Sequence, residues 1–218
     1  MSGRVVLAID TCGVTGSIAL GRVVDEELSV LGEATIPGGE LSIALVQAIA
    51  DLLAAAGVSV RGLGLIIAVT GPGSFTGIRV GLAVVKGLAE ANGIEVMTVS
   101  RLAMLAALAR TPTAVLDAHR GQVFCRISQA EGKAEEMLLT AGEINAMGGL
   151  PGPIGVCEES VAQALEELRG EPELVRVPAP AAADAMRFRL LHGEVADVET
   201  LDGYYLRGAD AKVAGGRA

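Results

Sequence analysis

The sequence predicts an α/β protein of two tandem halves, each with a mixed central sheet flanked by helices. Apolar strand-like runs alternate with helix-like runs, and the pattern partly restarts after Thr111-Pro112-Thr113. In both halves an early apolar strand ends in an aspartate, Asp10 and Asp117. A repeated order of elements indicates an internal structural repeat. We therefore expect a first half over residues 1–110, a second over 111–213, and a disordered tail at 214–218.

The first half is expected to open with three strands and then to alternate helix and strand. Its strands are expected at Arg4–Ile9, Ser17–Leu20, Leu28–Ile36, Leu63–Val69 and Glu95–Val99. Its helices are expected at Leu41–Ala56, Leu82–Ala91, and from an N-cap at Ser100 through Ala109. Gly57 directly follows the first of these helices and suits its C-cap, because glycine readily takes positive φ.

The second half repeats this beginning with shorter and less regular elements. Its strands are expected at Ala114–Asp117, Gln122–Ser128, Glu135–Leu139, Ile154–Cys157 and Leu174–Val177. Its helices are expected at Gly142–Met147, Glu158–Leu168 and Ala181–Leu191.

A glycine-rich turn, Thr70-Gly71-Pro72-Gly73-Ser74-Phe75-Thr76-Gly77-Ile78-Arg79-Val80-Gly81, joins a strand to a helix. Such a turn can hold a phosphate at the helix N-terminus. No lysine follows Gly77, as a P-loop requires, and this third glycine comes one residue late for a dinucleotide fingerprint. Close packing of the helix start on the sheet is therefore the favoured interpretation, with Ser74 or Thr76 as N-cap.

Composition excludes several classes of protein. The net charge is −9, which argues against nucleic-acid binding by this chain alone. Half of the residues are apolar, but only 2% are aromatic and there is no Trp, so Ala, Val, Leu and Ile must build the core. We expect no signal peptide and no uninterrupted apolar span long enough to cross a membrane. Three widely spaced cysteines suggest a reducing, cytoplasmic setting.

Residues for catalysis or metal binding are scarce, and no catalytic residue is assigned. His119 and His192 lie far apart in the sequence, so no metal site is expected on this chain. Ser74 lacks the G-x-S-x-G pattern and Cys12 has no nearby base.

The strand-end aspartates leave two interpretations open. Asp10, Thr11 and Asp117 are the candidate nucleotide-binding residues, because in actin-like ATPases two such hairpins face the phosphates and Mg²⁺. Alternatively, each aspartate caps its own hairpin turn. No Gly-Gly adenosine loop follows Ile154–Cys157, which favours the second interpretation.

The expected helix Leu41–Ala56 and the helical stretch Ile78–Ala91 carry more apolar surface than one sheet face can cover. We expect their outward residues to form an apolar patch that binds a partner. The Arg79 and Lys86 side chains would form either a salt-bridging rim around it or an ordinary solvated edge. The expected interface residues are Leu41, Ala44, Leu45, Ala48, Ile49, Leu52, Ile78, Arg79, Leu82, Val85, Lys86 and Ala89.

Several motifs together resemble the TsaB (YeaZ) family, over nearly the whole chain. They are Leu7-Ala8-Ile9-Asp10-Thr11, Gly71-Pro72-Gly73-Ser74-Phe75-Thr76-Gly77-Ile78-Arg79, Leu116-Asp117-Ala118, Gly121-Gln122-Val123-Phe124 and Tyr204-Tyr205-Leu206-Arg207. The resemblance implies an actin-like fold. It also implies a scaffold role in making threonylcarbamoyladenosine (t6A) at position 37 of tRNAs that read ANN codons. Glu40-Leu41-Ser42 departs from the family, which often has His-Ser there.

The resemblance further implies the partners. A TsaD-type paralogue would carry the metal and catalysis, a TsaE-type ATPase would join, and tRNA would be met only through the complex. This chain itself would need neither ATP nor a metal. It would pair with the TsaD-type subunit, or with itself as a homodimer, through helices of the first half. The alternative function is a stand-alone actin-like ATPase or small-molecule kinase using Asp10 and Asp117 around Mg-ATP.

Overall fold

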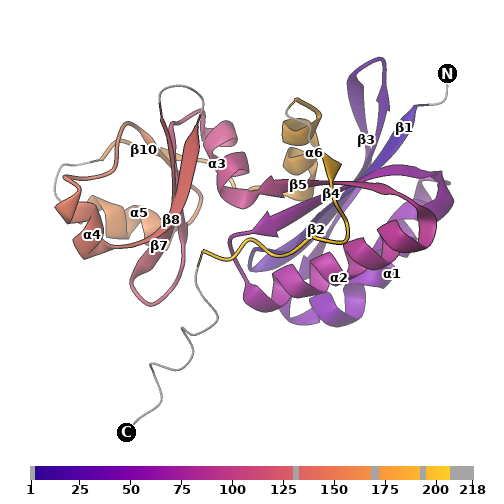
Figure 1. The fold of residues 1–218 in the computed structure, drawn as a ribbon, viewed down its shortest axis with the longest axis horizontal. Coiled ribbons are helices and arrows are strands. Elements are labelled where there is room, and N and C mark those ends of the chain that lie inside the picture. Colours follow the sequence, from indigo (N-terminus) through magenta and orange to yellow (C-terminus); the bar gives the residue numbers. More distant parts are fainter. Residues whose placement is uncertain (1–2, 130–132, 168–171, 192–194, 207–218) are drawn as a thin grey trace, which may run out of the picture.

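The computed structural model describes residues 3–129, 133–167, 172–191 and 195–206, with the side chains of 190 and 191 left out. Two α/β halves lie beside each other (Figure 1). The first sheet contains β1 Arg4–Asp10, β2 Thr15–Val24, β3 Glu27–Pro37, β4 Leu63–Gly71, β5 Glu95–Ser100 and β11 Val195–Ala196. The second contains β6 Thr113–Asp117, β7 Gln122–Ser128, β8 Ala134–Thr140, β9 Ile154–Val156 and β10 Leu174–Arg176.

The helices separate these strands in the expected order. They are α1 Leu41–Ala55, α2 Phe75–Asn92, α3 Arg101–Ala109, α4 Ala141–Ala146, α5 Glu159–Glu166 and α6 Ala182–Leu191, with short 3-10 turns at Gly38–Glu40 and Val60–Gly62. Helix α2 starts at Phe75, directly after Ser74, which is one of the two predicted N-caps and lies ahead of the apolar run Leu82–Ala91. The Ser74 hydroxyl caps it by accepting from the Gly77 N–H at 3.2 Å, so the second part of the glycine run is helical.

Apart from β11, which pairs antiparallel at one edge of the first sheet, the two sheets have the same topology. The first runs β11-β5-β4-β1-β2-β3 and the second β10-β9-β6-β7-β8. In each, the first three strands pair antiparallel, and the fourth and fifth continue from the first strand in parallel. The sequence prediction of two α/β halves with mixed sheets flanked by helices is thereby confirmed.

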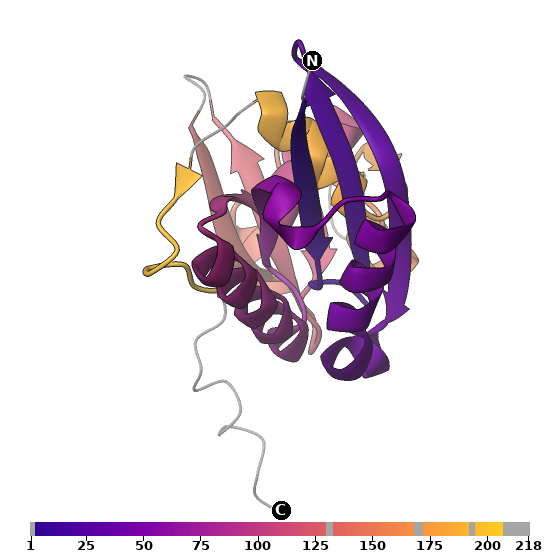
Figure 2. The same cartoon turned by 90° about the vertical axis from the view of Figure 1, so that its right-hand side faces the viewer.

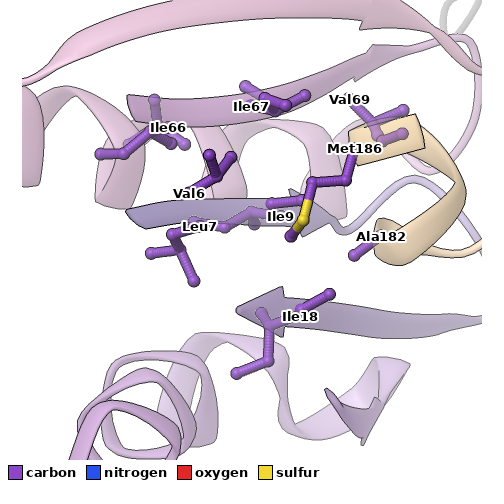
Figure 3. Close-up of a cluster of buried hydrophobic side chains, with 14 of the residues drawn as sticks. Val6, Leu7, Ile9, Ile18, Ile66, Ile67, Val69, Ala182 and Met186 are labelled. Carbon is purple, nitrogen blue, oxygen red and sulfur yellow. The ribbon is translucent and has the colours of Figure 1, made fainter. Parts of the chain in front are cut away.

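The core of the first half forms around β1 and β4. From Val5 to Asp10 every β1 residue is buried, which requires helices on both faces of the sheet. Helices α1 and α2 lie on one face and α6 on the other (Figures 1 and 2). Figure 3 shows side chains of β1, β2, β4 and α6 meeting in this cluster, with Met186 fully buried.

The last helix does not follow the expected division at residue 110. Helix α6 contributes Ala182, Ala185 and Met186 to the core of the first half, and β11 pairs with β5 at its sheet edge. Helix α3 contributes Leu102 and Leu105 to a cluster with the second sheet, while its Met104 packs into the first core. Helix α3 is thus shared between the two cores, and α6 packs on the first half although it follows the second half in the sequence.

One apolar segment of the first half, interrupted by Glu40 and Asp51, has the length of a membrane span. Gly38–Ala55 is 18 residues long with a mean hydropathy of 1.4, so by length and composition it could cross a membrane. In the fold only 22% of this segment is buried, through α1 residues such as Leu45 and Ile49 that pack on the sheet. Its other face is exposed.

Candidate functional site

A cavity of about 580 Å³ lies between the two halves. The first half contributes the turn after β1, the glycine turn before α2, and the first residue of α3. The second half contributes the turn after β6, and the crossing segment Leu201–Leu206 closes part of the wall. Representative lining residues are Gly73, Phe75, Arg101, Asp117, Glu158 and Tyr205.

Both strand-end aspartates cap their own turns. The Cys12 N–H donates to Asp10 Oδ1 at 2.8 Å, and the His119 N–H donates to Asp117 Oδ1 at 2.6 Å. Each is an aspartate bonding the backbone two residues ahead, as in an Asx-turn. The local capping interpretation is confirmed at both positions.

Only one of the three candidate nucleotide-binding residues lines the cavity. Asp117 lines the cavity, whereas Asp10 and Thr11 are buried and are not among the lining residues. Thr11 lies against α2, because a Cβ on Gly77 would overlap its carbonyl oxygen and a Cβ on Gly81 its hydroxyl. Gly77 and Gly81 thus allow α2 to pack closely on the β1 end, as the packing interpretation of the glycine turn expects.

Arg101 lies at the centre of the site and was missed by the sequence analysis. Its side chain is 8% exposed, and its Nε has no hydrogen-bond partner among the residues that the structure describes. Asp10 Oδ2 and Glu158 Oε1 each lie 4.0 Å from its guanidinium group, one from each half of the molecule. The available signal was a single charge at the start of the apolar helix Arg101–Ala109, directly after the N-cap Ser100.

Burial governs the titration of the groups around Arg101. Desolvation raises the pKa of Asp10, although the Arg101 charge and the Cys12 N–H act in the opposite direction. Desolvation and the nearby Asp10 charge also hold the pKa of the Cys12 thiol well above its usual value. Cys12 therefore stays protonated and is a poor nucleophile.

A second polar cluster connects the halves beside the cavity. The Ser100 hydroxyl, at the end of β5, lies 2.8 Å from both carboxylate oxygens of Glu136 on β8. Arg126 on β7 donates to the same carboxylate at 2.6 Å, and the Glu136 side chain is only 5% exposed. This cluster holds the two sheets in a fixed relation at one side of the cavity.

Seven of the twelve expected interface residues lie on the inner faces of α1 and α2, so for them the prediction of an outward position was wrong. The buried members belong to the chain's own core, because the apolar stripe of each helix packs on the sheet. They are Leu41, Leu45, Ile49, Ile78, Leu82, Val85 and Ala89. Ala44, Ala48, Leu52 and Lys86 are half-buried, and Arg79 is exposed, with its guanidinium group 3.8 Å from the centroid of the Phe75 ring.

The outward faces of α1 and α2 contain other apolar or small residues. Ile43 is 83% exposed and Val46 63% exposed, both on α1. On α2 the exposed positions include Ala83 and Gly87, and a Cβ on Gly87 would meet no atom within 4 Å. We call Ile43, Val46, Ala83 and Gly87 the outer helix face.

Among the residues that the structure describes, no cluster of three or more His, Cys, Asp or Glu side chains could hold a metal ion. His119 is 81% exposed at the side chain, with Nδ1 3.1 Å from Asp117 Oδ2. His192, Arg207 and the expected disordered tail at 214–218 lie outside the described residues.

Comparison with known proteins identifies a family that matches most of the chain. Residues 39–181 match the family model TsaD: tRNA N6-adenosine threonylcarbamoyltransferase. A Bacillus subtilis (strain 168) protein, tRNA threonylcarbamoyladenosine biosynthesis protein TsaB, is 34% identical over 128 residues, which are 57% of this chain. The match spans 55% of that relative's own length.

Two solved structures share the fold over nearly the whole chain. One is described as an uncharacterized protein with similarity to peptidase YEAZ from Pseudomonas aeruginosa, with TM-score 0.70 and 26% identity, covering 94% of this chain and 100% of that one. The other, YeaZ from Pseudomonas aeruginosa, has TM-score 0.70 and 24% identity, covering 93% and 100%. The motifs, the repeated topology and the family model together show that this chain belongs to the TsaD family of tRNA N6-adenosine threonylcarbamoyltransferase proteins, with its likeness to TsaB and YeaZ members.

Proposed function

We propose that this chain is a noncatalytic scaffold subunit in the synthesis of t6A at position 37 of tRNA. Family membership and the name of the Bacillus subtilis relative support the pathway. The scaffold role is supported by the two strand-end aspartates, whose carboxylates are engaged in their own turns. The catalytic subunit would be a TsaD-type paralogue carrying the metal, with a TsaE-type ATPase joining the complex in the cytoplasm.

The observation that carries the scaffold proposal is the outer helix face. A large apolar side chain that is 83% exposed, such as Ile43, favours burial against another protein. With Val46 one turn further along α1, it offers an apolar anchor pair on one helix. A paralogue of the same fold would present matching helices, and a second copy of this chain would give a two-fold homodimer.

Gly87 adds an independent argument for close approach of a partner. Glycine inside a helix costs roughly 0.5–1 kcal/mol relative to alanine. Within the described chain nothing requires a glycine at this position, since its Cβ would be in open space. A partner helix packing against α2 at this point would require a residue without a side chain.

The partner surface is tested by reconstitution with the TsaD-type protein of the same cell. Ile43→Glu and Val46→Glu should keep the fold, because both side chains are exposed, but should abolish co-purification and tRNA modification. Met147→Glu is the matched control, since Met147 is 52% exposed on the second half. Normal complex formation by the Ile43→Glu, Val46→Glu double variant would move the partner site elsewhere.

The noncatalytic role is tested at the two aspartates. Asp10→Asn and Asp117→Asn retain an oxygen that can accept the same backbone N–H, so each turn should remain intact. Complexes containing either variant should modify tRNA at the wild-type rate. ATP turnover by the isolated chain that Asp10→Asn abolishes would instead support the ATPase or kinase alternative.

A further inference from the structure

We propose that the cavity between the halves binds a small amphipathic oxyanion, a carboxylate or phosphate attached to an apolar ring. Arg101 would hold the anionic group, and the aromatic wall of the cavity would hold the ring. This inference does not depend on the scaffold function, because it concerns only the isolated chain.

The anion site rests on the bonding of Arg101. A buried guanidinium group that lacks hydrogen bonds is costly, and a carboxylate or phosphate is its preferred partner. The Arg101 Nε is buried and forms no such bond within the described part of the chain. Its two neighbouring carboxylates lie at 4.0 Å, which is beyond hydrogen-bond distance.

The neighbouring carboxylates already have backbone partners. Asp10 Oδ1 accepts from the Cys12 N–H, and Glu158 Oε2 accepts from the Asp117 N–H at 2.6 Å. The Asp117 carboxylate is paired with His119, and Arg120 is a further lining residue. Gly13 lies directly against the Arg101 guanidinium group, because a Cβ there would be 3.0 Å from Nη2. The guanidinium group is thus positioned by its surroundings, and Arg101 is one of the residues that line the cavity.

The apolar part of the ligand is indicated by where the aromatic residues lie. The whole chain has three Phe, two Tyr and no Trp. Phe75, Phe124, Tyr204 and Tyr205 all line this cavity. The Phe75 and Tyr205 rings are 5.3 Å apart between centroids and tilted by 50°. Four of five aromatic rings around one cavity of ligand size form a wall suited to a ring-shaped apolar body.

The aromatic composition also provides the assay. Because the chain has no Trp and both tyrosines line the cavity, its intrinsic fluorescence reports on this site. We expect saturable changes in tyrosine emission on titration with cyclohexyl phosphate or cyclohexanecarboxylate, neither of which absorbs at the excitation wavelength. Comparing the two identifies phosphate or carboxylate as the preferred anion. Neutral cyclohexanemethanol and inorganic phosphate, each lacking one part of the ligand, should bind at least tenfold more weakly.

Arg101→Met tests the proposed anchor, and Arg61→Met is the matched control on an exposed turn. Arg101→Met should weaken binding of the preferred probe by about tenfold to a hundredfold, the range for a lost charged hydrogen bond. Arg61→Met should leave it unchanged. Equal binding by wild type and Arg101→Met would overturn the proposal, as would the absence of saturable binding by either anionic probe.

A wild-type measurement covers the case in which Arg101→Met does not fold. The Nε–H signals of ¹⁵N-labelled arginines can be followed by NMR during the same titration. One arginine Nε–H should shift with the same midpoint as the tyrosine emission. Emission changes without any arginine shift would show that Arg101 is not the anchor.

Discussion

The two halves share one strand order but differ in their helices. In the first half, α1 has 15 residues and α2 has 18; at the same points of the second half, α4 has 6 and α5 has 8. The short helices suffice to cover the second sheet, as Val161 and Leu165 of α5 are buried there. The strands beside these short helices are short too, with three residues each in β9 and β10 against nine in β4 and six in β5. Longer strands account for longer helices, but not for the exposure of Ile43 and Val46 on α1. The exposed apolar residues of α1 are those that the proposed partner contact would cover.

The largest expected effect separates the inner from the outer face of α1. Leu45→Glu places a carboxylate in the first core, where Leu45 is 1% exposed, and should cost about 4 kcal/mol or more. Leu82→Glu should act similarly on α2. Ile43→Glu, two residues before Leu45, should leave the urea midpoint nearly unchanged. A folded Leu45→Glu variant would show that we have assigned the faces of α1 incorrectly.

The next effect concerns the close packing of α2, which has no counterpart on α5. Gly77→Ala should lower the free energy of unfolding by about 2–3 kcal/mol, since its Cβ would overlap a backbone oxygen that cannot rotate away. Gly87→Ala on the same helix should raise it by about 0.5–1 kcal/mol. Chemical denaturation measures both. In the reconstituted complex Gly87→Ala should weaken partner binding, whereas equal affinity would remove the close-approach argument.

A smaller effect is expected where the two halves are connected. Glu136→Gln replaces the carboxylate that binds Ser100 and Arg126 with a neutral amide, and should cost about 1–3 kcal/mol. Because the cluster connects the two sheets, exchange protection should fall at the β5 and β8 ends rather than throughout both cores. Glu135→Gln, the neighbouring β8 residue, is the control. Uniform loss of protection in both halves would contradict a role at this junction.

The smallest effect concerns α4 and its dependence on pH. Thr140 and Glu143 form a capping box, and these hydrogen bonds lower the pKa of Glu143 below 4.5. Its stabilising contribution is therefore complete above pH 4.5 and is lost as pH falls through the lower, folded value. Glu143→Gln should remove this part of the acid dependence. Identical stability curves below pH 4.5 would show that the cap contributes nothing measurable.

Local sequence signals predicted the fold well because each strand and helix shows its own pattern. The repeat could be recognised from the aspartates ending β1 and β6, which perform the same local task in both halves. The faces of α1 and α2 could not be assigned in this way. Both sides of these helices are apolar, so the sequence does not show which stripe packs on the sheet.

The candidate site was only partly predictable because long-range contacts create it. The Arg101, Glu158 and Tyr205 side chains are brought together by the association of the two halves. No spacing motif connects residues so far apart in the sequence. The same reason explains why the exchange of α3 and α6 between the halves was not expected.

The position of α6 has a consequence for synthesis on the ribosome. The Ala182 N–H bonds to the Ser17 hydroxyl at 2.9 Å, and Met186 fills the space above Gly21, so late residues complete the earliest sheet. Until α6 leaves the exit tunnel, β1 and β4 of the nascent chain have one face without its covering helix. A gene divided after codon 110 would thus yield a first fragment that lacks one layer of its own core.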